Sequence, residues 1–438
     1  MSNTVDALLK FINESPSCFH AIDNIKTILL KHQYIELLEN ATWDLKKGQR
    51  YFVTRNASSV LAFQVPNDLQ HLNFQIVASH SDSPTFKIKP NAEILVKDVY
   101  RQLNVEGYGG MIASSWLDRP LSIAGRVIVK EKDQFVTKLC KLDEDLCVIP
   151  SLAIHMNHNI NDGYKYNLQS DMLPLMGMKQ AKDLNTKISE ALNIKEESIL
   201  DGDLYLYNRD LGKVWGSDKE FISSPKLDNL ECAFTSLQAF IQTSNPTSIN
   251  VFACFDNEEV GSSTKQGADG TFLPDCLGRI TNALHLNQEQ FHQALASSFM
   301  VSADNAHALH PNHPDKNDPT NPVFMNHGIV IKYSAKQSYT SDAMSASIMI
   351  DLCKKAKVPY QKFVNRSDMP GGSTLGNISS HQVSILTCDI GLAMLSMHSA
   401  NECAGYQDVD YMVNVLKEFY QRSIENVNNT TFVLRGEK

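Results

Sequence analysis

The spacing of hydrophobic residues changes several times along this chain and marks out its predicted elements. Within residues 4–40 the apolar positions recur with helical spacing, which predicts helices that break near Pro16. Residues 51–64 alternate between apolar and polar positions and therefore predict paired strands. The apolar run at residues 73–79 predicts a further strand that leads directly into His80.

Beyond Pro84 the pattern becomes a series of short β-like runs separated by Gly, Pro, Asn and Asp. In this region only residues 178–192 have helical spacing. We therefore predict an inserted β-rich domain at residues 91–222, while residues 1–90 and 223–438 form one discontinuous domain. A chain of 438 residues is long enough for two hydrophobic cores, which supports this division.

Strands and helices alternate again after residue 224. The predicted strands lie at residues 250–255, 299–302 and 383–387, and the predicted helices at residues 229–243, 288–298, 341–357 and 406–422. Such alternation predicts an α/β fold in which helices flank a mixed central β-sheet.

Composition and charge limit the partners and the compartment. The formal net charge is −9 and no run of Lys or Arg occurs, so neither nucleic acid nor an anionic membrane is an expected partner. No apolar run reaches the length that spans a membrane, and the N-terminal residues do not resemble a signal peptide. Nine cysteines without a C-x-x-C pair are typical of a reducing compartment, so we expect a cytoplasmic protein.

The stretch Phe252–Ser262, FACFDNEEVGS, carries the first sign of chemistry. Its apolar strand ends in three carboxylates, Asp256, Glu258 and Glu259. A buried strand that ends this way is costly unless a cation lies there, and strand ends are common ligand sites in α/β sheets. A solvated acidic turn is the alternative. If both glutamates lie in a turn, one can bind metal while the other transfers protons during hydrolysis.

Further metal-capable residues follow other predicted strands. His80 and Asp304 each end an apolar run, His398 does so less cleanly, and Asp228 lies just before a helix. Each alone has an ordinary alternative, such as a hydrogen-bonded histidine or a helix N-cap. Together they form a set of imidazoles and carboxylates that suits Zn²⁺, Mn²⁺ or Co²⁺. Asp82 is placed to accept the second imidazole N–H of His80.

These segments together resemble the aspartyl aminopeptidase family, in its bacterial form, over nearly the whole chain. The segments that match, in the expected order, are His80-Ser81-Asp82-Ser83-Pro84, Leu227-Asp228-Asn229, Asp256-Asn257-Glu258-Glu259-Val260-Gly261-Ser262, Ser302-Ala303-Asp304, Ala306-His307-Ala308-Leu309-His310-Pro311-Asn312 and Met397-His398-Ser399. The resemblance implies a zinc-dependent exopeptidase fold and an enzyme that removes N-terminal Asp or Glu from peptides with a free N-terminus.

The resemblance also implies two divalent ions in each subunit, with Zn²⁺ expected and Mn²⁺ or Co²⁺ as alternatives. One ion is expected on His80, Asp228 and Asp304, and the other on Asp228, Glu259 and His398. Glu258 is expected as the general base and acid for attack by a metal-activated water, and Asp82 as the partner that orients His80.

The remaining implied roles concern substrate and assembly. Lys332 is expected to pair with the acidic side chain, and the turn containing Gly371, Gly372 and Ser373 to present backbone N–H groups. His155 is expected to reach the active site of a neighbouring subunit, in a dodecamer built from dimers through the inserted domain. Without the resemblance these residues would be a solvated strand end, a tight turn and an ordinary core or surface histidine.

Two alternatives stay open. No G-x-S-x-G, H-E-x-x-H or G-x-G-x-x-G motif leading into a helix occurs, so serine hydrolases, single-zinc proteases and dinucleotide enzymes are unsupported. One alternative is an aminopeptidase with the same metals and a preference for neutral N-terminal residues. The other is a non-enzymatic assembly protein with a vestigial metal site, against which the intact ligand set and Glu258 argue.

Overall fold

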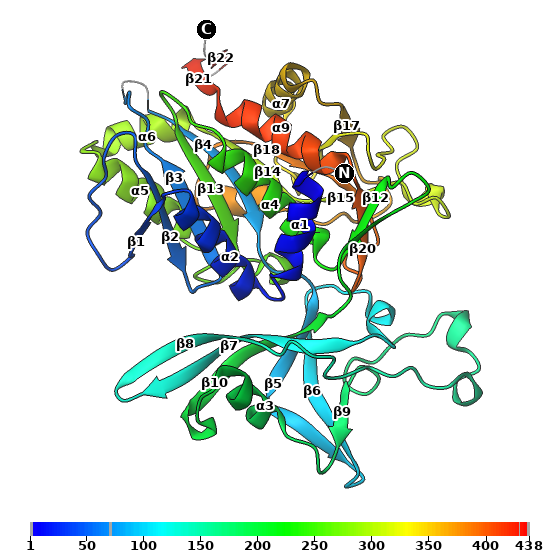
Figure 1. The fold of residues 1–438 in the computed structure, drawn as a ribbon. Coiled ribbons are helices and arrows are strands. Elements are labelled where there is room, and N and C mark those ends of the chain that lie inside the picture. Colours follow the sequence, from blue (N-terminus) through cyan, green and yellow to red (C-terminus); the bar gives the residue numbers. More distant parts are fainter. Residues whose placement is uncertain (1–2, 70–71, 429, 436–438) are drawn as a thin grey trace.

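A nine-stranded mixed sheet lies at the centre of the larger part of the molecule (Figure 1). We describe residues 3–69, 72–428 and 430–435 of a computed structural model. The strands, in spatial order, are β1 (Ile35–Leu37), β2 (Arg50–Arg55), β3 (Ser59–Gln64), β13 (Ile249–Phe255), β4 (Phe74–His80), β14 (Phe299–Ala303), β18 (Leu386–Gly391), β16 (Ile329–Lys332) and β17 (Tyr360–Phe363).

The middle strands of this sheet run in parallel and are fully buried. β13 pairs with β4, β4 with β14, and β14 with β18, all in parallel. Their side chains alternate between the two faces, so that Phe252 and Cys254 pack on one side while Val251 and Ala253 pack on the other. Parallel neighbours place their carboxyl ends at the same edge of the sheet, and the candidate site lies at that edge.

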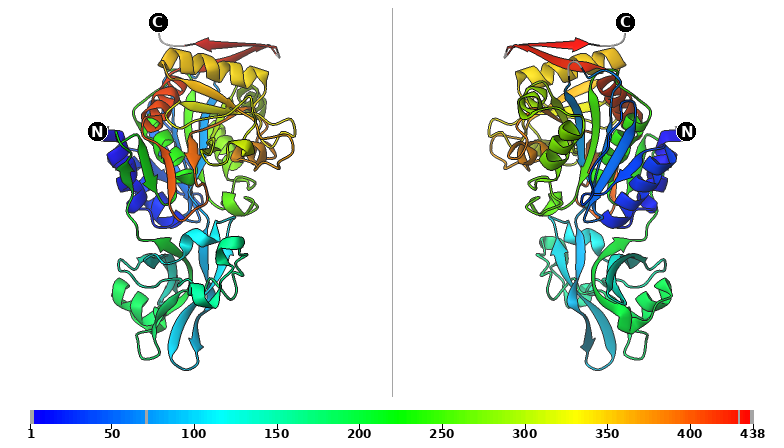
Figure 2. Two further views of the ribbon diagram at one scale, coloured as in Figure 1. Left: turned by 90° about the vertical axis from the view of Figure 1, so that its right-hand side faces the viewer. Right: turned by 90° about the vertical axis from the view of Figure 1, so that its left-hand side faces the viewer.

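Helices cover both faces of the sheet and make the three-layer arrangement that the sequence predicts (Figures 1 and 2). On one face lie α1 (Asn3–Asn13), α2 (Cys18–Lys31), α4 (Leu227–Ile241), α7 (Ala343–Ala356) and α9 (Asp408–Tyr420), and on the other α5 (Phe272–Ala283), α6 (Gln288–Ala296) and α8 (Leu375–Ser380). The apolar stripe of α1 is fully buried, which explains why its helical spacing was visible in the sequence.

Two smaller sheets complete this part of the molecule. One contains β11 (Lys213–Trp215), β12 (Phe221–Ser224), β20 (Glu402–Gly405), β19 (Ala393–Leu395) and β15 (Ala306–His307). The other is a hairpin of β21 (Ser423–Asn428) and β22 (Thr431–Arg435). The first of these sheets matters for function because β19 leads into His398.

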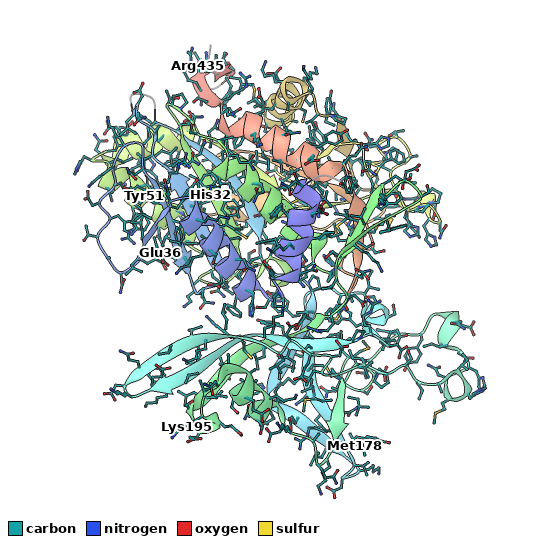
Figure 3. All side chains as sticks on the ribbon, in the orientation of Figure 1. His32, Glu36, Tyr51, Met178, Lys195 and Arg435 are labelled. Carbon is teal, nitrogen blue, oxygen red and sulfur yellow. The ribbon has the colours of Figure 1, made fainter. Side chains whose placement is uncertain are left out.

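A separate antiparallel sheet with its own hydrophobic core forms the second lobe (Figures 1 and 2). Its strands, in spatial order, are β8 (Gln134–Lys141), β7 (Leu121–Glu131), β10 (Ile199–Asn208), β5 (Thr85–Val96), β6 (Tyr100–Tyr108) and β9 (Leu175–Met178), and α3 (Leu184–Leu192) packs beside them. Met178 and Lys195 lie in this lobe, away from the body that carries Tyr51 and Arg435 (Figure 3). An arm with short turns at Ile154–Met156 and Ile160–Asp162 extends from it (Figure 1).

Several predicted boundaries are wrong for identifiable reasons. Helical structure does not continue to residue 40, because residues 35–37 pair with β2 as strand β1. The helix predicted from residue 178 begins only at Leu184, since Met178 pairs with β6 as the end of β9. The strand predicted at residues 383–387 begins at Leu386. Helix α5 and the C-terminal hairpin were not predicted. No helix in the described part of the chain combines the length and apolarity needed to cross a bilayer.

Candidate metal centre

Three neighbouring strand ends form the floor of the site. β4 ends at His80, opposite Phe255 of β13, and Asp304 follows β14 directly. After β13 the chain turns sharply, and Glu258 and Glu259 lie in a single helical turn beyond the strand, which is the arrangement that allows both to approach one site. Gly261 ends this turn at φ +95°, a conformation that favours glycine. Side chains from three strands therefore meet at one edge.

Asp228 and His398 approach the same edge from elsewhere. Asp228 lies in the first turn of α4 with a non-helical backbone, and the N-cap position is taken by Lys226. The side chain of Asp228 therefore does not cap the helix. Its Oδ1 lies 3.7 Å from His80 Nε2, and its Oδ2 lies 3.4 Å from His398 Nε2. His398 lies after β19 in the left-handed region, at φ +66°.

The predicted ligands gather in two groups that share one carboxylate. His80, Asp228 and Asp304 form one group, and Asp228, Glu259 and His398 form the other, with the ligand atoms of each group within 4.8 Å of one another. Glu258 reaches the same space, because it forms a further group of this kind with His80 and Glu259. All five residues expected as ligands thus converge, and Asp228 occupies the bridging position.

Both imidazoles are held by their Nδ1 atoms, which leaves Nε2 facing the carboxylates. His80 Nδ1 lies 3.1 Å from the backbone oxygen of Asp82 and 3.3 Å from its Oδ1. His398 Nδ1 donates to the backbone oxygen of Gly110 at 2.8 Å. Hydrogen bonds of this kind select the tautomer whose Nε2 can bind a metal. Asp82 therefore lies where the sequence-based expectation put it.

The charges in the site are unbalanced without a cation. Burial raises the pKa of Glu258 to about 8, with the charge of Asp304 adding to the rise and His80 opposing it. Burial and the charge of Asp228 raise the pKa of Glu259 well above its usual value. Burial disfavours the charged form of His398, but its hydrogen bond to Asp228 and the charge of Glu259 raise the pKa to about 10.

One buried oxygen supports the fit of a metal directly. Asp228 is 3% exposed, and its Oδ1 has no hydrogen-bond partner among the described residues. A buried carboxylate oxygen in this state is costly unless a cation binds it. Two imidazoles and three carboxylates are also a donor set that Zn²⁺ accepts. The residues present therefore fit a zinc site.

Some residues that hold the site were not identified from the sequence. Glu402 is 2% exposed and accepts hydrogen bonds from the backbone N–H groups of His398, at 2.7 Å, and Asp228, at 2.9 Å. Asn305 donates to the backbone oxygen of Leu227 at 3.2 Å and so ties the end of β14 to the start of α4. Neither residue stands out locally, although Asn305 lies between two of the segments that carry the resemblance.

The remaining predicted residues lie in three places. Lys332 is 2% exposed at the end of β16; burial opposes its charge, but Asp304 raises its pKa, so a solvated strand end is excluded. Gly371, Gly372 and Ser373 are exposed, and Gly371 lines a cavity of ≈ 280 Å³. His155 is exposed on the turn Ile154–Met156 of the arm. Among the described residues of one chain, His155 belongs to none of the groups that could hold a metal ion.

Comparison with known proteins identifies first the class of enzyme and then the family to which this chain belongs. The family model "Aminopeptidase I zinc metalloprotease (M18)" matches residues 11–420. Together with the fold and the metal groups, this match defines a zinc metallo-aminopeptidase that acts on peptides. The chain belongs to the M18 family.

Similar proteins support this assignment and differ in how finely they are named. A probable M18 family aminopeptidase 2 of Clostridium novyi is 47% identical over 421 residues, which cover 94% of this chain and 97% of the relative. A probable aspartyl aminopeptidase of Ricinus communis is 36% identical over 463 residues, covering 94% of each chain. The name of the more similar relative thus does not state a substrate preference.

Solved structures show the same fold. The cryo-EM structure of the Ape4 and Nbr1 complex superimposes with a TM-score of 0.90 at 35% identity, covering 95% of this chain and 85% of that chain. A structure described as the S. cerevisiae mApe1 dodecamer matches with a TM-score of 0.84 at 24% identity, covering 95% of this chain and 96% of that one. The predicted α/β architecture with its additional antiparallel sheet is confirmed.

Proposed function

We propose that this aminopeptidase removes N-terminal Asp and Glu residues from peptides by means of two zinc ions in each subunit. The observation that carries the proposal is the pair of ligand groups that share Asp228. One ion would be held by His80, Asp228 and Asp304, and the other by Asp228, Glu259 and His398. When bound, such a pair of ions supplies Lewis-acid activation of water and of the scissile carbonyl.

Within this proposal Glu258 takes a proton from the attacking water and later delivers one to the leaving amine. The turn that carries Glu258 is held by Asp82, whose carboxylate accepts the backbone N–H of Glu258 at 3.2 Å and that of Glu259 at 3.1 Å. Burial raises the pKa of Glu258 above the usual value of a glutamate, and a carboxyl with a raised pKa is a better acceptor of a proton from water. Asp82 also keeps His80 in the orientation that a metal ligand requires.

Two observations support a preference for acidic N-terminal residues. Lys332 places a buried ammonium group at the sheet edge beside Asp304, where it can attract a substrate carboxylate. The loop with Gly371, Gly372 and Ser373 is attached to the central sheet beside Lys332. Thr374, which follows the loop, donates to Asp389 of β18 at 2.5 Å, and β18 pairs with the strand of Lys332. An aminopeptidase with a neutral preference would not need a buried cation at this position.

The preference is tested with Asp-, Glu- and Leu-7-amido-4-methylcoumarin substrates. We expect the acidic substrates to have the higher kcat/KM. We expect Lys332→Met to lower kcat/KM for the Asp substrate by about 10- to 100-fold, the value of one charged hydrogen bond, and to affect the Leu substrate much less. The exposed Lys336→Met is the matched control. Higher kcat/KM for Leu, or an equal loss on both substrates, would contradict the acidic preference.

We further propose that the β-rich insertion predicted at residues 91–222 assembles the enzyme and that His155 serves the site of a neighbouring subunit. Leu152, Ile154 and Met156 support this, because these apolar side chains are 56%, 47% and 74% exposed around His155. An exposed apolar cluster on an extended arm is typical of a surface that another molecule covers. A dodecamer built from dimers is the assembly we propose, in keeping with the dodecameric mApe1 structure.

Co-expression of two inactive chains tests the role of His155. His155→Ala and Glu258→Gln are each expected to lower activity alone. If His155 acts on the neighbouring site, mixed oligomers should regain up to about one quarter of wild-type activity, since Glu258 and His155 come from different chains, each intact half of the time. No recovery in mixed oligomers of unchanged mass would place His155 outside the neighbouring site.

A further inference from the structure

The end of strand β6, in the inserted sheet, lies directly against the metal centre. The Tyr108 hydroxyl donates to Asp82 Oδ2 at 2.8 Å. Two residues further on, the backbone oxygen of Gly110 accepts from His398 Nδ1 at 2.8 Å, and Ile112 N–H donates to the backbone oxygen of His398 at 3.0 Å. One short segment of the insertion therefore contacts the supports of both imidazole ligands.

The backbone can approach so closely because the segment contains two glycines. Gly109 has φ +74°, and a Cβ atom there would lie 3.1 Å from Glu259 Cβ. A Cβ atom on Gly110 would lie 3.7 Å from His398 Nδ1. The segment is thus packed against ligands of the second group as well as against the partner of His80.

Tyr108 connects three parts of the site through one hydroxyl. Besides donating to Asp82, the hydroxyl accepts from Asn257 Nδ2 at 2.9 Å. Asn257 begins the turn that carries Glu258 and Glu259. The hydroxyl therefore lies between the partner of His80 and the glutamate turn, and it satisfies both with a single donor and acceptor.

Asp82 is oriented in part by this hydroxyl. Asp82 is 4% exposed, and its Oδ2 accepts both from Tyr108 and from the backbone N–H of Glu259. Its Oδ1 accepts from the backbone N–H of Glu258 and lies 3.3 Å from His80 Nδ1. The Tyr108 hydroxyl is the side-chain donor on the oxygen that faces away from His80, so it adds to the two backbone N–H groups that orient the carboxylate.

We propose that Tyr108 is a positioning residue of the metal centre, through which the inserted sheet holds Asp82 against His80 and anchors the turn of Glu258. The proposal rests on the zinc site proposed above. Removal of the hydroxyl leaves the buried carboxylate of Asp82 with its two backbone donors but short of one donor on Oδ2. Asp82 then holds His80 and the turn of Glu258 less rigidly, and zinc binds less tightly.

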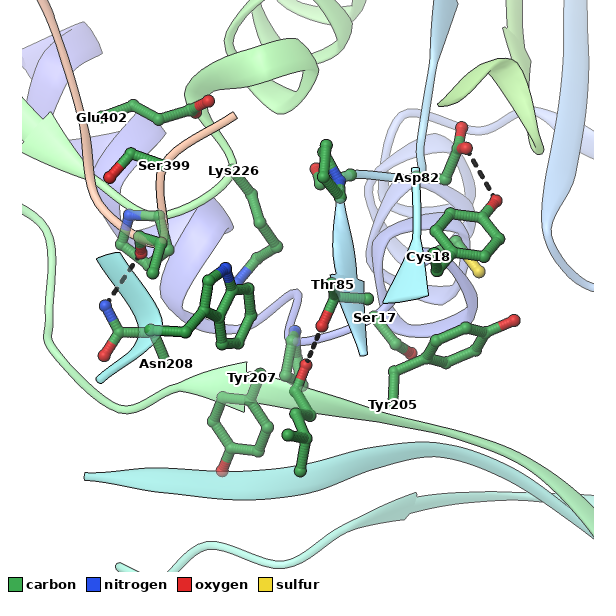
Figure 4. Close-up of a pocket in the computed structure, with 18 of the residues that line it drawn as sticks. Ser17, Cys18, Asp82, Thr85, Tyr205, Tyr207, Asn208, Lys226, Ser399 and Glu402 are labelled. Atoms are coloured by element: carbon green, nitrogen blue, oxygen red, sulfur yellow. Dashed lines mark hydrogen bonds between the residues drawn. The ribbon is translucent and has the colours of Figure 1, made fainter. Parts of the chain in front are cut away.

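Tyr205 provides a matched control in the same environment. Its ring packs edge-on against the Tyr108 ring, with centroids 5.5 Å apart, and it lies on β10 of the same sheet. Asp82 and Tyr205 both line the small pocket between the two lobes, where the dashed line at Asp82 marks its hydrogen bond (Figure 4). No hydrogen bond of the Tyr205 hydroxyl occurs among the described residues, so Tyr205→Phe keeps the ring pair and removes no hydrogen bond from the site.

The experiment compares full-length wild-type, Tyr108→Phe and Tyr205→Phe enzymes. Zinc affinity is measured by competition with a chromogenic chelator, and thermal unfolding is followed for the zinc-free proteins. We expect Tyr108→Phe to weaken zinc binding by about 10-fold and to lower kcat by about 10- to 100-fold at little change in KM. Excess zinc should restore occupancy, and Tyr205→Phe should stay within about twofold of wild type.

Unchanged zinc affinity in Tyr108→Phe would overturn the proposal, even if the zinc-free variant melts earlier, since the hydroxyl would then support only the fold. An equal loss in Tyr205→Phe would also overturn it, because the effect would then not depend on the hydrogen bonds of the Tyr108 hydroxyl. Absence of zinc binding by the wild-type enzyme would instead contradict the proposed function, which keeps the two failures distinct.

Discussion

Glu258→Gln should lower kcat by roughly 10²- to 10⁴-fold while both zinc ions stay bound. The amide has the same size as the carboxyl but cannot take a proton from water. The geometry of the turn should persist, because its backbone N–H groups, not the side chain of Glu258, bind Asp82. Activity and zinc content are measured on the same preparation, by hydrolysis of an Asp substrate and by atomic absorption.

A second buried glutamate, Glu231, is the control that separates the chemical role of Glu258 from the effect of changing a buried carboxyl. Glu231 is fully buried, and burial together with the charge of Asp408 raises its pKa to about 8, the same value as for Glu258. Its Oε2 accepts from Asn305, and it is absent from the metal groups. Glu231→Gln should therefore change kcat by less than about threefold, since it replaces a protonated acid with a neutral amide.

The outcome distinguishes two roles for Glu258. Full hydrolysis by Glu258→Gln would exclude it as the general base. Loss of one zinc ion together with activity would make it a ligand instead, as its proximity to His80 and Glu259 allows.

Removal of zinc should destabilise the enzyme, and the effect should grow between pH 5.5 and 8.5. Each ion that binds only the folded state contributes about 4 kcal/mol at a free concentration about 1,000 times its Kd. Without zinc, the buried carboxyls of Glu258 and Glu259 must stay protonated or repel their neighbours. Two binding sites that share Asp228 therefore make zinc binding a large part of the stability of the larger lobe, which contains the nine-stranded sheet.

The sign of the pH dependence follows from the pKa values. Glu258, with a pKa of about 8, binds more protons in the folded state than in the unfolded state, where a glutamate has a pKa of about 4.3. The stability of the zinc-free protein must fall as pH rises through this interval. His398 acts in the same direction: its contribution is complete below about pH 6.5 and is lost as pH rises towards 10.

Zinc binding has the opposite dependence, because its ligands must lose their protons first. The difference in Tm between the zinc-loaded and EDTA-treated enzymes should widen from pH 5.5 to pH 8.5. Asp228→Asn, which alters the carboxylate common to both groups, is the control that should respond little to zinc. A difference that stays constant or shrinks with pH would contradict the assignment of these groups as ligands.

The parts of the site that lie within one short stretch of sequence could be predicted, because that stretch alone shows where a buried strand ends. A buried strand is apolar along most of its length, so its end is visible where polar residues cluster, as at His80 and Glu258. The stripe of α1 and the alternation of β2 and β3 were visible for the same reason. Predictions were wrong where pairing with another strand overrode local spacing, as at residues 35–37 and at Met178.

The sequence by itself determined most of the elements, the α/β class and, through a resemblance carried by several motifs, which residues are expected in the site. Only the tertiary structure decided that β4, β13 and β14 are parallel neighbours and that Asp228 lies between the two imidazoles. The same holds for the hydrogen bonds of Glu402 to the backbone of Asp228 and His398, and of Tyr108 to Asp82. The physical reason is that periodicity records burial along one element. A hydrogen bond between residues that are far apart in the chain leaves no period in either segment.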